Sequence, residues 1–128
     1  MGGGVPGGSG SGGGGRECVL KGTDIRALGG VAIETSEHEQ ADWVRIEAED
    51  GRSLVCTPDH PLYHAKHGKT EAELLVAGMT VLTDQGEAML VKVERIHQEG
   101  TKVAVKMSKG HLFWANGFLS HNLKKFEG

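Results

Sequence analysis

Gly110-His111-Leu112-Phe113-Trp114-Ala115-Asn116-Gly117-Phe118-Leu119-Ser120-His121-Asn122 joins two apolar runs through a turn and ends in a His-Asn pair. Asn-Gly between such runs is a strong hairpin signal, so the stretch predicts a final strand pair. The side-chain amide of Asn122 can attack the backbone carbonyl of the same residue. This step closes a succinimide and expels Leu123 as an amine. His121 titrates near neutral pH and can protonate the leaving nitrogen. This ending therefore predicts a self-cleaving peptide bond.

A second imidazole belongs to the same stretch, because His111 lies ten residues before His121. The two could divide the work, one protonating the leaving amine and the other polarising or deprotonating the Asn122 amide. Core packing is the alternative role for His111.

Composition favours one soluble domain with no nucleic-acid or membrane partner. The chain has 128 residues, 38% hydrophobic content and a net charge of -3. No basic run exceeds Lys124-Lys125, so we expect no nucleic-acid partner. No apolar run approaches the roughly 20 residues of a membrane span, so we expect no membrane partner. Two cysteines allow one disulfide, too few for a disulfide-built scaffold, and the cellular compartment stays open.

Glycine is concentrated in the first residues, which marks a linker. We expect residues 1–17 to form a Gly-rich flexible flank, residues 18–122 to form the folded domain, and residues 123–128 to form a second flank.

Short alternating segments separated by turns predict an all-β fold for this domain. Glu49-Asp50-Gly51 and Asp84-Gln85-Gly86 are the expected turns. The expected elements are strands at Trp43–Ala48, Ser53–Cys56, Thr80–Thr83, Met89–Ile96 and Lys102–Met107, and at most one short helical turn within Thr70–Ala77.

A cysteine opens the folded region. The thiol of Cys18 can attack the carbonyl of Glu17 through a five-membered ring, turning the peptide bond into a thioester. Taken alone, a cysteine is more often a small buried residue.

Thr57-Pro58-Asp59-His60 follows an expected strand and combines a hydroxyl with an imidazole. Thr57 and His60 could hydrogen-bond the Glu17-Cys18 amide and loosen it before it breaks. Taken alone, the tetrapeptide is more often a turn in which Thr57 caps and Asp59 and His60 are solvated.

Together these pieces resemble the hedgehog/intein superfamily. Its members often open with Cys-x-x-x-Gly-Thr-x-Ile, carry Thr-x-x-His-Pro internally, and close with His-x-Phe-x-Ala-Asn-Gly and His-Asn. The matching residues are Cys18, Gly22, Thr23 and Ile25; Thr57, His60 and Pro61; and His111, Phe113, Ala115, Asn116, Gly117, His121 and Asn122.

The resemblance implies a compact horseshoe-like β fold with adjacent chain ends, where Cys18, His60 and Asn122 converge. It implies single-turnover cleavage in cis rather than a turnover enzyme. The substrates would be the chain's own flanks, the acceptor would be water or an external thiol, and no cofactor or metal would take part. We expect a monomer, because the reaction is unimolecular.

Three departures from the family pattern shape the expected outcome. Leu123 follows the final Asn, where splicing members usually have Cys, Ser or Thr. Without that nucleophile, cleavage at one or both ends is expected, with splicing as a minor outcome, as in bacterial intein-like domains. The position of the family's aspartate falls near Ala104. The stretch from Ile25 to Trp43 is shorter than usual and lacks the family's Gly-Asp turn, so the sequence does not predict whether a hairpin forms there.

Other readings compete with self-processing. Cys56, His60, His64 and His67 are donors that zinc accepts, although Pro58 and Pro61 make a shared helix unlikely. A non-catalytic β interaction domain and a Cys-His protease acting on other proteins are further alternatives.

Overall fold

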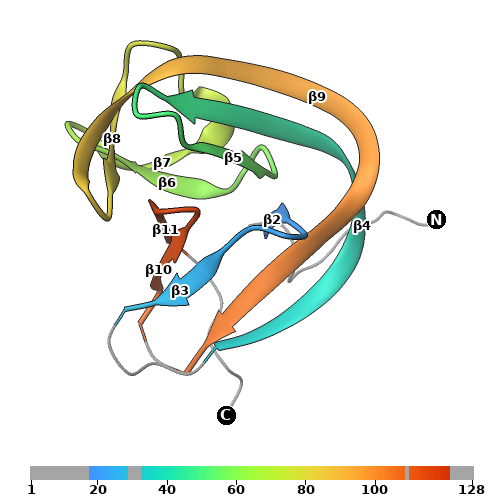
Figure 1. Cartoon of the computed structure of the whole chain (residues 1–128). Helices are drawn as coiled ribbons and strands as arrows, with labels where there is room; N and C mark the ends of the chain where they lie inside the picture. Colours follow the sequence, from blue (N-terminus) through green and yellow to red (C-terminus); the bar gives the residue numbers. More distant parts are fainter. Residues whose placement is uncertain (1–17, 29–32, 109, 122–128) are drawn as a thin grey trace.

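The computed structural model describes residues 18–28, 33–108 and 110–121. These residues form one antiparallel sheet in the order β2-β5-β4-β9-β8-β6-β11-β10-β3, with β7 paired to β6 (Figure 1). The prediction of an all-β fold is confirmed. No helix in the described part of the chain has the length and apolar character needed to cross a membrane.

The elements are short except for two strands. They are β2 (Cys18–Leu20), β3 (Ile25–Ala27), β4 (Ile33–Ala48), β5 (Ser53–Cys56), β6 (Pro61–His64), β7 (Gly68–Glu71), the 3-10 turn η1 (Ala72–Leu74), β8 (Thr80–Thr83), β9 (Gly86–Met107), β10 (Leu112–Ala115) and β11 (Phe118–His121).

Strands β4 and β9 form a long ribbon that curves around the other elements (Figure 1). Their pairing runs from Ile33 opposite Met107 to Ala48 opposite Leu90. The register shifts between Gln40 and Asp42, and such irregularities bend a strand pair and increase its twist. The curvature gives the horseshoe-like outline expected from the sequence.

The ribbon corrects one expectation. Met89–Ile96 and Lys102–Met107 were expected as separate strands, but β9 is continuous. The polar residues between them resemble a turn in sequence. In the structure His97 pairs with Asp42 and Gly100 pairs with Gln40, so the ladder to β4 keeps this segment extended.

The predicted hairpins are confirmed. β4 pairs with β5 across a turn in which Gly51 has a φ of 94°. β10 pairs with β11 across Asn116 and Gly117, whose φ values are 50° and 87°. Positive φ at both turn residues matches the right-handed twist of the strands, and Asn-Gly tolerates it best.

The prediction of at most one short helical turn within Thr70–Ala77 is confirmed. The beginning of this segment belongs to β7, where Thr70 pairs with Leu62 of β6, and only η1 is helical. The backbone N–H of Glu73 bonds the carbonyl of Pro58 at 2.9 Å. Strand pairing and this tertiary bond outweigh helix propensity, which is a weak preference. The β6–β7 hairpin was not predicted.

The core lies between the folded halves of the sheet. Phe113 and Phe118 of the last hairpin are fully buried, and complete burial of such a side chain stabilises the fold by roughly 1.5–3 kcal/mol. Leu62 is also fully buried. The last hairpin is thereby anchored against β6, which fixes the position of the C-terminal end.

Candidate functional site

Thr57 holds the backbone of Cys18 from both sides. The Cys18 N–H donates to Thr57 Oγ1 at 3.0 Å, and the Thr57 hydroxyl donates to the Cys18 carbonyl at 3.3 Å. The Thr57 N–H bonds the same carbonyl at 2.9 Å. Both residues are about 98–99% buried, since Cys18 is 1% and Thr57 2% exposed. The bonded nitrogen is the one that Cys18 contributes to its peptide bond with Glu17.

His60 is brought to the same place by the turn after β5. Its backbone N–H bonds the Thr57 carbonyl at 3.0 Å, and its carbonyl accepts the Ala72 N–H at 2.9 Å. The ring is fully buried and meets Phe113 edge-on, with ring centroids 6.0 Å apart. The imidazole is thus fixed between the Thr57 turn and the last hairpin.

His111 and His121 stack at the opposite end of the chain. Their ring centroids lie 4.9 Å apart and their planes differ by 13°. Burial, followed by the positive charge of Lys69 and by His111, lowers the pKa of His121 to about 4. His121 is therefore neutral at pH 7. Its Nδ1 is buried with no hydrogen-bond partner among the described residues.

The segment from Thr57 to Leu62 connects the two ends. Thr57 bonds Cys18 at the N-terminal side, and Leu62 of β6 pairs with Ser120 of β11, next to His121. Five of the six predicted site residues lie in the described part of the chain, namely Cys18, Thr57, His60, His111 and His121. Asn122 and Glu17 lie outside the described residues.

Ala104 is the residue of β9 directly opposite Cys18. This is the position near which the family's aspartate was expected to fall. The methyl group of Ala104 is 7% exposed and offers neither charge nor proton to the site.

Cys56 lies on β5 beside β2, but its thiol stays protonated and does not act as a nucleophile. Its Sγ lies 3.8 Å from the Val44 carbonyl, and burial, with a smaller effect of Asp59, raises the pKa of its thiol far above the ordinary range. A thiol is a poor nucleophile, so Cys56 stays inert at neutral pH. No disulfide joins Cys18 and Cys56, although Val19 pairs with Cys56.

The four side chains weighed as a zinc site do not form one cluster. The rings of His64 and His67 lie 4.6 Å apart, but Nδ1 of His64 accepts the backbone N–H groups of Lys66 and His67. Cys56 and His60 are fully buried. Among residues 18–28, 33–108 and 110–121, no three His, Cys, Asp or Glu side chains gather as metal ligands would.

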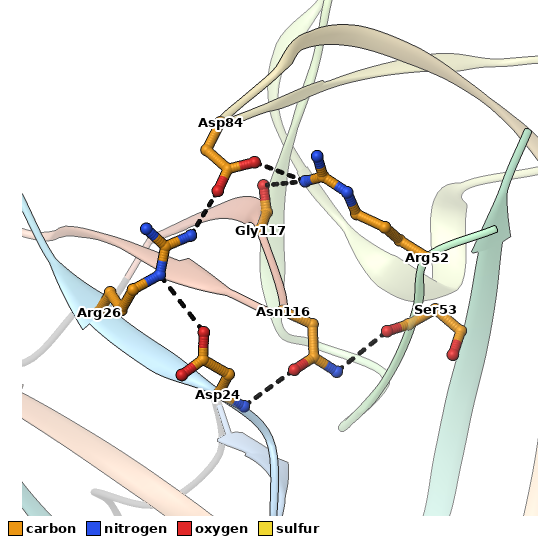
Figure 2. Close-up of a pocket in the computed structure, with 7 residues that line it drawn as sticks. All are labelled: Asp24, Arg26, Arg52, Ser53, Asp84, Asn116 and Gly117. Atoms are coloured by element: carbon orange, nitrogen blue, oxygen red, sulfur yellow. Dashed lines mark hydrogen bonds and ion pairs between the residues drawn. The ribbon is translucent and has the colours of Figure 1, made fainter. Parts of the chain in front are cut away.

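A polar cluster closes the other end of the last hairpin. Asp84 pairs with both Arg26 and Arg52, and Arg52 also donates to the Gly117 carbonyl at 3.3 Å (Figure 2). These residues line a surface pocket of about 470 Å³. The hydrogen bonds from Arg26 and then Arg52 lower the pKa of Asp84 below its ordinary value.

Asn116 completes this cluster. Its Oδ1 accepts the Asp24 N–H at 2.8 Å, and its Nδ2 donates to the Ser53 carbonyl at 3.0 Å (Figure 2). The turn residue thereby ties β3 and β5 to the last hairpin, which holds β11 and its terminal His121 in place.

Three neighbours of the site could not be identified from the sequence. Phe113 contacts His60, Tyr63 packs against His121 with ring centroids 6.3 Å apart, and Lys69 acts on the charge of His121. Tyr63 and Lys69 face one another across the β6–β7 hairpin, which the sequence reasoning missed. Gly68, which follows the turn at residues 65–67 and opens β7 with a φ of 78°, is the local sequence signal that indicates this hairpin.

Comparison with known proteins identifies the fold. No protein-family model and no curated protein matches the chain. Among solved structures, a bacterial intein-like domain from Clostridium thermocellum is 17% identical, with a TM-score of 0.69 over 83% of this chain and 99% of that one.

Two inteins are also similar. The MchDnaB-1 intein is 14% identical, with a TM-score of 0.64 over 84% of this chain and 98% of that one. The gp41-1 intein is 24% identical, with a TM-score of 0.59 over 71% and 70%. The chain has the hedgehog/intein fold, as its motifs indicated.

Proposed function

We propose that this chain is an intein-like autoprocessing domain that breaks peptide bonds at its own two ends. The observation that carries the proposal is the 3.0 Å hydrogen bond from the Cys18 nitrogen to Thr57 Oγ1. That nitrogen would be the leaving group, and the nucleophilic thiol belongs to the same residue. A buried hydroxyl that holds the leaving nitrogen favours an acyl shift, because it fixes the peptide bond beside the attacking thiol.

At the N-terminal side, Cys18 Sγ attacks the carbonyl carbon of Glu17. The C–N bond of the peptide breaks, a C–S bond forms, and the thiol proton passes to the departing nitrogen with the help of His60. Thr57 holds that nitrogen while the bond breaks. Water or an external thiol then attacks the thioester, releases residues 1–17 and restores the Cys18 thiol.

At the C-terminal side, the side-chain amide nitrogen of Asn122 attacks the backbone carbonyl carbon of the same residue. The bond to the nitrogen of Leu123 breaks as a succinimide closes. Because the pKa of His121 is about 4, His121 is neutral and suited to accept the amide proton. The stacked His111 supplies the proton that the leaving nitrogen takes up.

Cleavage, rather than splicing, is the main outcome of the two reactions. Leu123 has no hydroxyl or thiol to take over the acyl group from Cys18, so ligation of the flanks is at most minor. Residues 18–122 are the processing domain, and residues 1–17 and 123–128 are its substrates. The reaction needs no cofactor, and one chain suffices.

Intact-mass measurements on three variants test this proposal. Cys18→Ala blocks release of residues 1–17 but leaves tail release unchanged, and Asn122→Ala has the opposite effect. Cys56→Ala is the matched cysteine control and leaves both products unchanged, with folding checked by circular dichroism. A non-catalytic β domain would give the same single mass for all of these chains.

A further inference from the structure

A second pocket, of about 340 Å³, opens beside the residue that holds Cys18. Thr57 lines this pocket, and its hydroxyl oxygen also accepts the hydrogen bond from the Cys18 nitrogen. The pocket is lined by Gln40, Thr57, Pro58, Asp59, Glu73 and Lys102.

The strand register places this pocket on the same side of β2 as the Cys18 side chain. Leu20 pairs with Lys102 and Cys18 pairs with Ala104, and alternate residues of paired strands point to one face. Lys102 lines the pocket, so Cys18 belongs to the pocket's face. A flank bound in extended form would direct the residue two positions before Cys18 to this face. That residue is Arg16.

The charges around the pocket favour a cation. Lys102 is held by Gln40 at 3.2 Å, and Glu73 is shared with Arg95 at 3.5 Å. Asp59 also lines the pocket, and its negative charge contributes to the raised pKa of the Cys56 thiol. A guanidinium pairs with a carboxylate through charge-assisted hydrogen bonds, which fix geometry as well as adding energy.

We propose that this pocket is a specificity subsite that accepts a cationic side chain two positions before Cys18, here Arg16, with Asp59 as its ion-pair partner. The inference rests on the proposed function. Anchoring Arg16 would hold the Glu17 carbonyl over Cys18 Sγ, and loss of such positioning slows a reaction without removing any reacting group. Asp59 is thus a positioning residue.

Charge reversal tests the subsite through the rate of thiol-induced head release. We expect Arg16→Glu to slow release about tenfold or more and Arg16→Lys to retain most of the rate. The double change Arg16→Glu with Asp59→Lys should recover much of it. Lys66→Glu reverses a charge in the exposed β6–β7 turn and should have no effect. Equal rates for Arg16→Glu and the unchanged chain would overturn the proposal.

A measurement independent of cleavage separates the subsite from the function. In the Cys18→Ala chain, Arg16→Gln should move the NMR amide resonances of Thr57 and Asp59, whereas Lys66→Gln should not. If the unchanged chain never releases its head, the proposed function fails, and these resonances alone decide the subsite. Resonances that do not respond to Arg16→Gln would contradict it.

Discussion

The nitrogen of Cys18 and the hydroxyl of Thr57 lie 3.0 Å apart, although 39 residues separate them in the chain. This contact joins the first strand of the domain to the turn that carries His60. It also places a buried hydroxyl on the one nitrogen that must leave if the Glu17-Cys18 bond is to break.

Replacing this hydroxyl should affect both stability and head release. Thr57→Val keeps the shape but leaves the buried Cys18 N–H without its acceptor, which costs about 1–3 kcal/mol in the free energy of unfolding. Thiol-induced release of residues 1–17 should slow by about 10- to 100-fold. Urea denaturation and intact-mass kinetics measure the two effects. Thr57→Ser is the control, and equal rates for Val and Ser would exclude a role for the hydroxyl.

Tail release should persist into acid. Because the pKa of His121 is lowered from 6.5 to about 4, its neutral form is retained down to about pH 4, and the rate should fall only below that. Lys69→Gln removes a positive charge, raises the pKa of His121 and moves the acid limb to higher pH, whereas Lys66→Gln leaves it unmoved. An acid limb near 6.5 in the unchanged chain would contradict this role.

The same shift has a consequence for folding. The unfolded chain protonates His121 near 6.5 and the folded chain near 4, so this residue's contribution to stability is lost as pH falls between those values. Circular dichroism must therefore accompany the rates, so that loss of activity is distinguished from loss of the fold.

Replacing Gly117 of the β10–β11 turn should destabilise the fold more than replacing Gly51 of the β4–β5 turn. Gly117 and Gly51 have φ values of 87° and 94°, so alanine is strained at either position. A Cβ at Gly117 would also clash with the guanidinium of Arg52 and displace it from Asp84 and the Gly117 carbonyl, whereas nothing lies within 4 Å at Gly51. Gly117→Ala should lower the melting temperature by several degrees more than Gly51→Ala. Equal losses would mean that Arg52 moves aside at no cost.

The Asp84 cluster should stabilise the fold in a pH-dependent way. The pKa of Asp84 is depressed, so its contribution is present at neutral pH and is lost as pH falls below its ordinary range. Asp84→Asn should lower the melting temperature by only a few degrees at pH 7, because the ion pairs are partly exposed. The loss should be smaller at pH 3, because the Asp84 carboxylate is then partly protonated in the unchanged chain. Glu87→Gln, at an exposed position, is the control. A deficit that does not depend on pH would argue against the ion pairs.

Much of the fold could be predicted because its hairpins depend on local signals. Asn116-Gly117 and Glu49-Asp50-Gly51 specify turns through the backbone conformations that they tolerate. The continuous β9 could not be predicted in the same way, because only its partner β4 keeps the polar segment around Gly100 extended. The short helical turn expected within Thr70–Ala77 is present as η1, whereas strand β7 depends on its pairing with β6 and could not be predicted from local propensity.

Some features of the candidate site could also be predicted from the sequence, whereas others depend on tertiary contacts. Motif spacing predicted Thr57 and Cys18 as site residues, and the structure joins their side chain and backbone at 3.0 Å. The neutral state of His121 could not be predicted, since it depends on burial and on Lys69 from a hairpin that the sequence did not reveal. Asn116 was recognised only as a turn residue, whereas its side chain also joins Asp24 to Ser53.

The mass spectrum of the chain incubated with an excess of a small thiol tests the central claim most directly. We expect a fragment of residues 1–17 that carries the added thiol as a C-terminal thioester, formed by the unchanged chain and not by Cys18→Ala. A chain that keeps its full mass throughout, or a Cys18→Ala chain that releases the same fragment at the same rate, would contradict it.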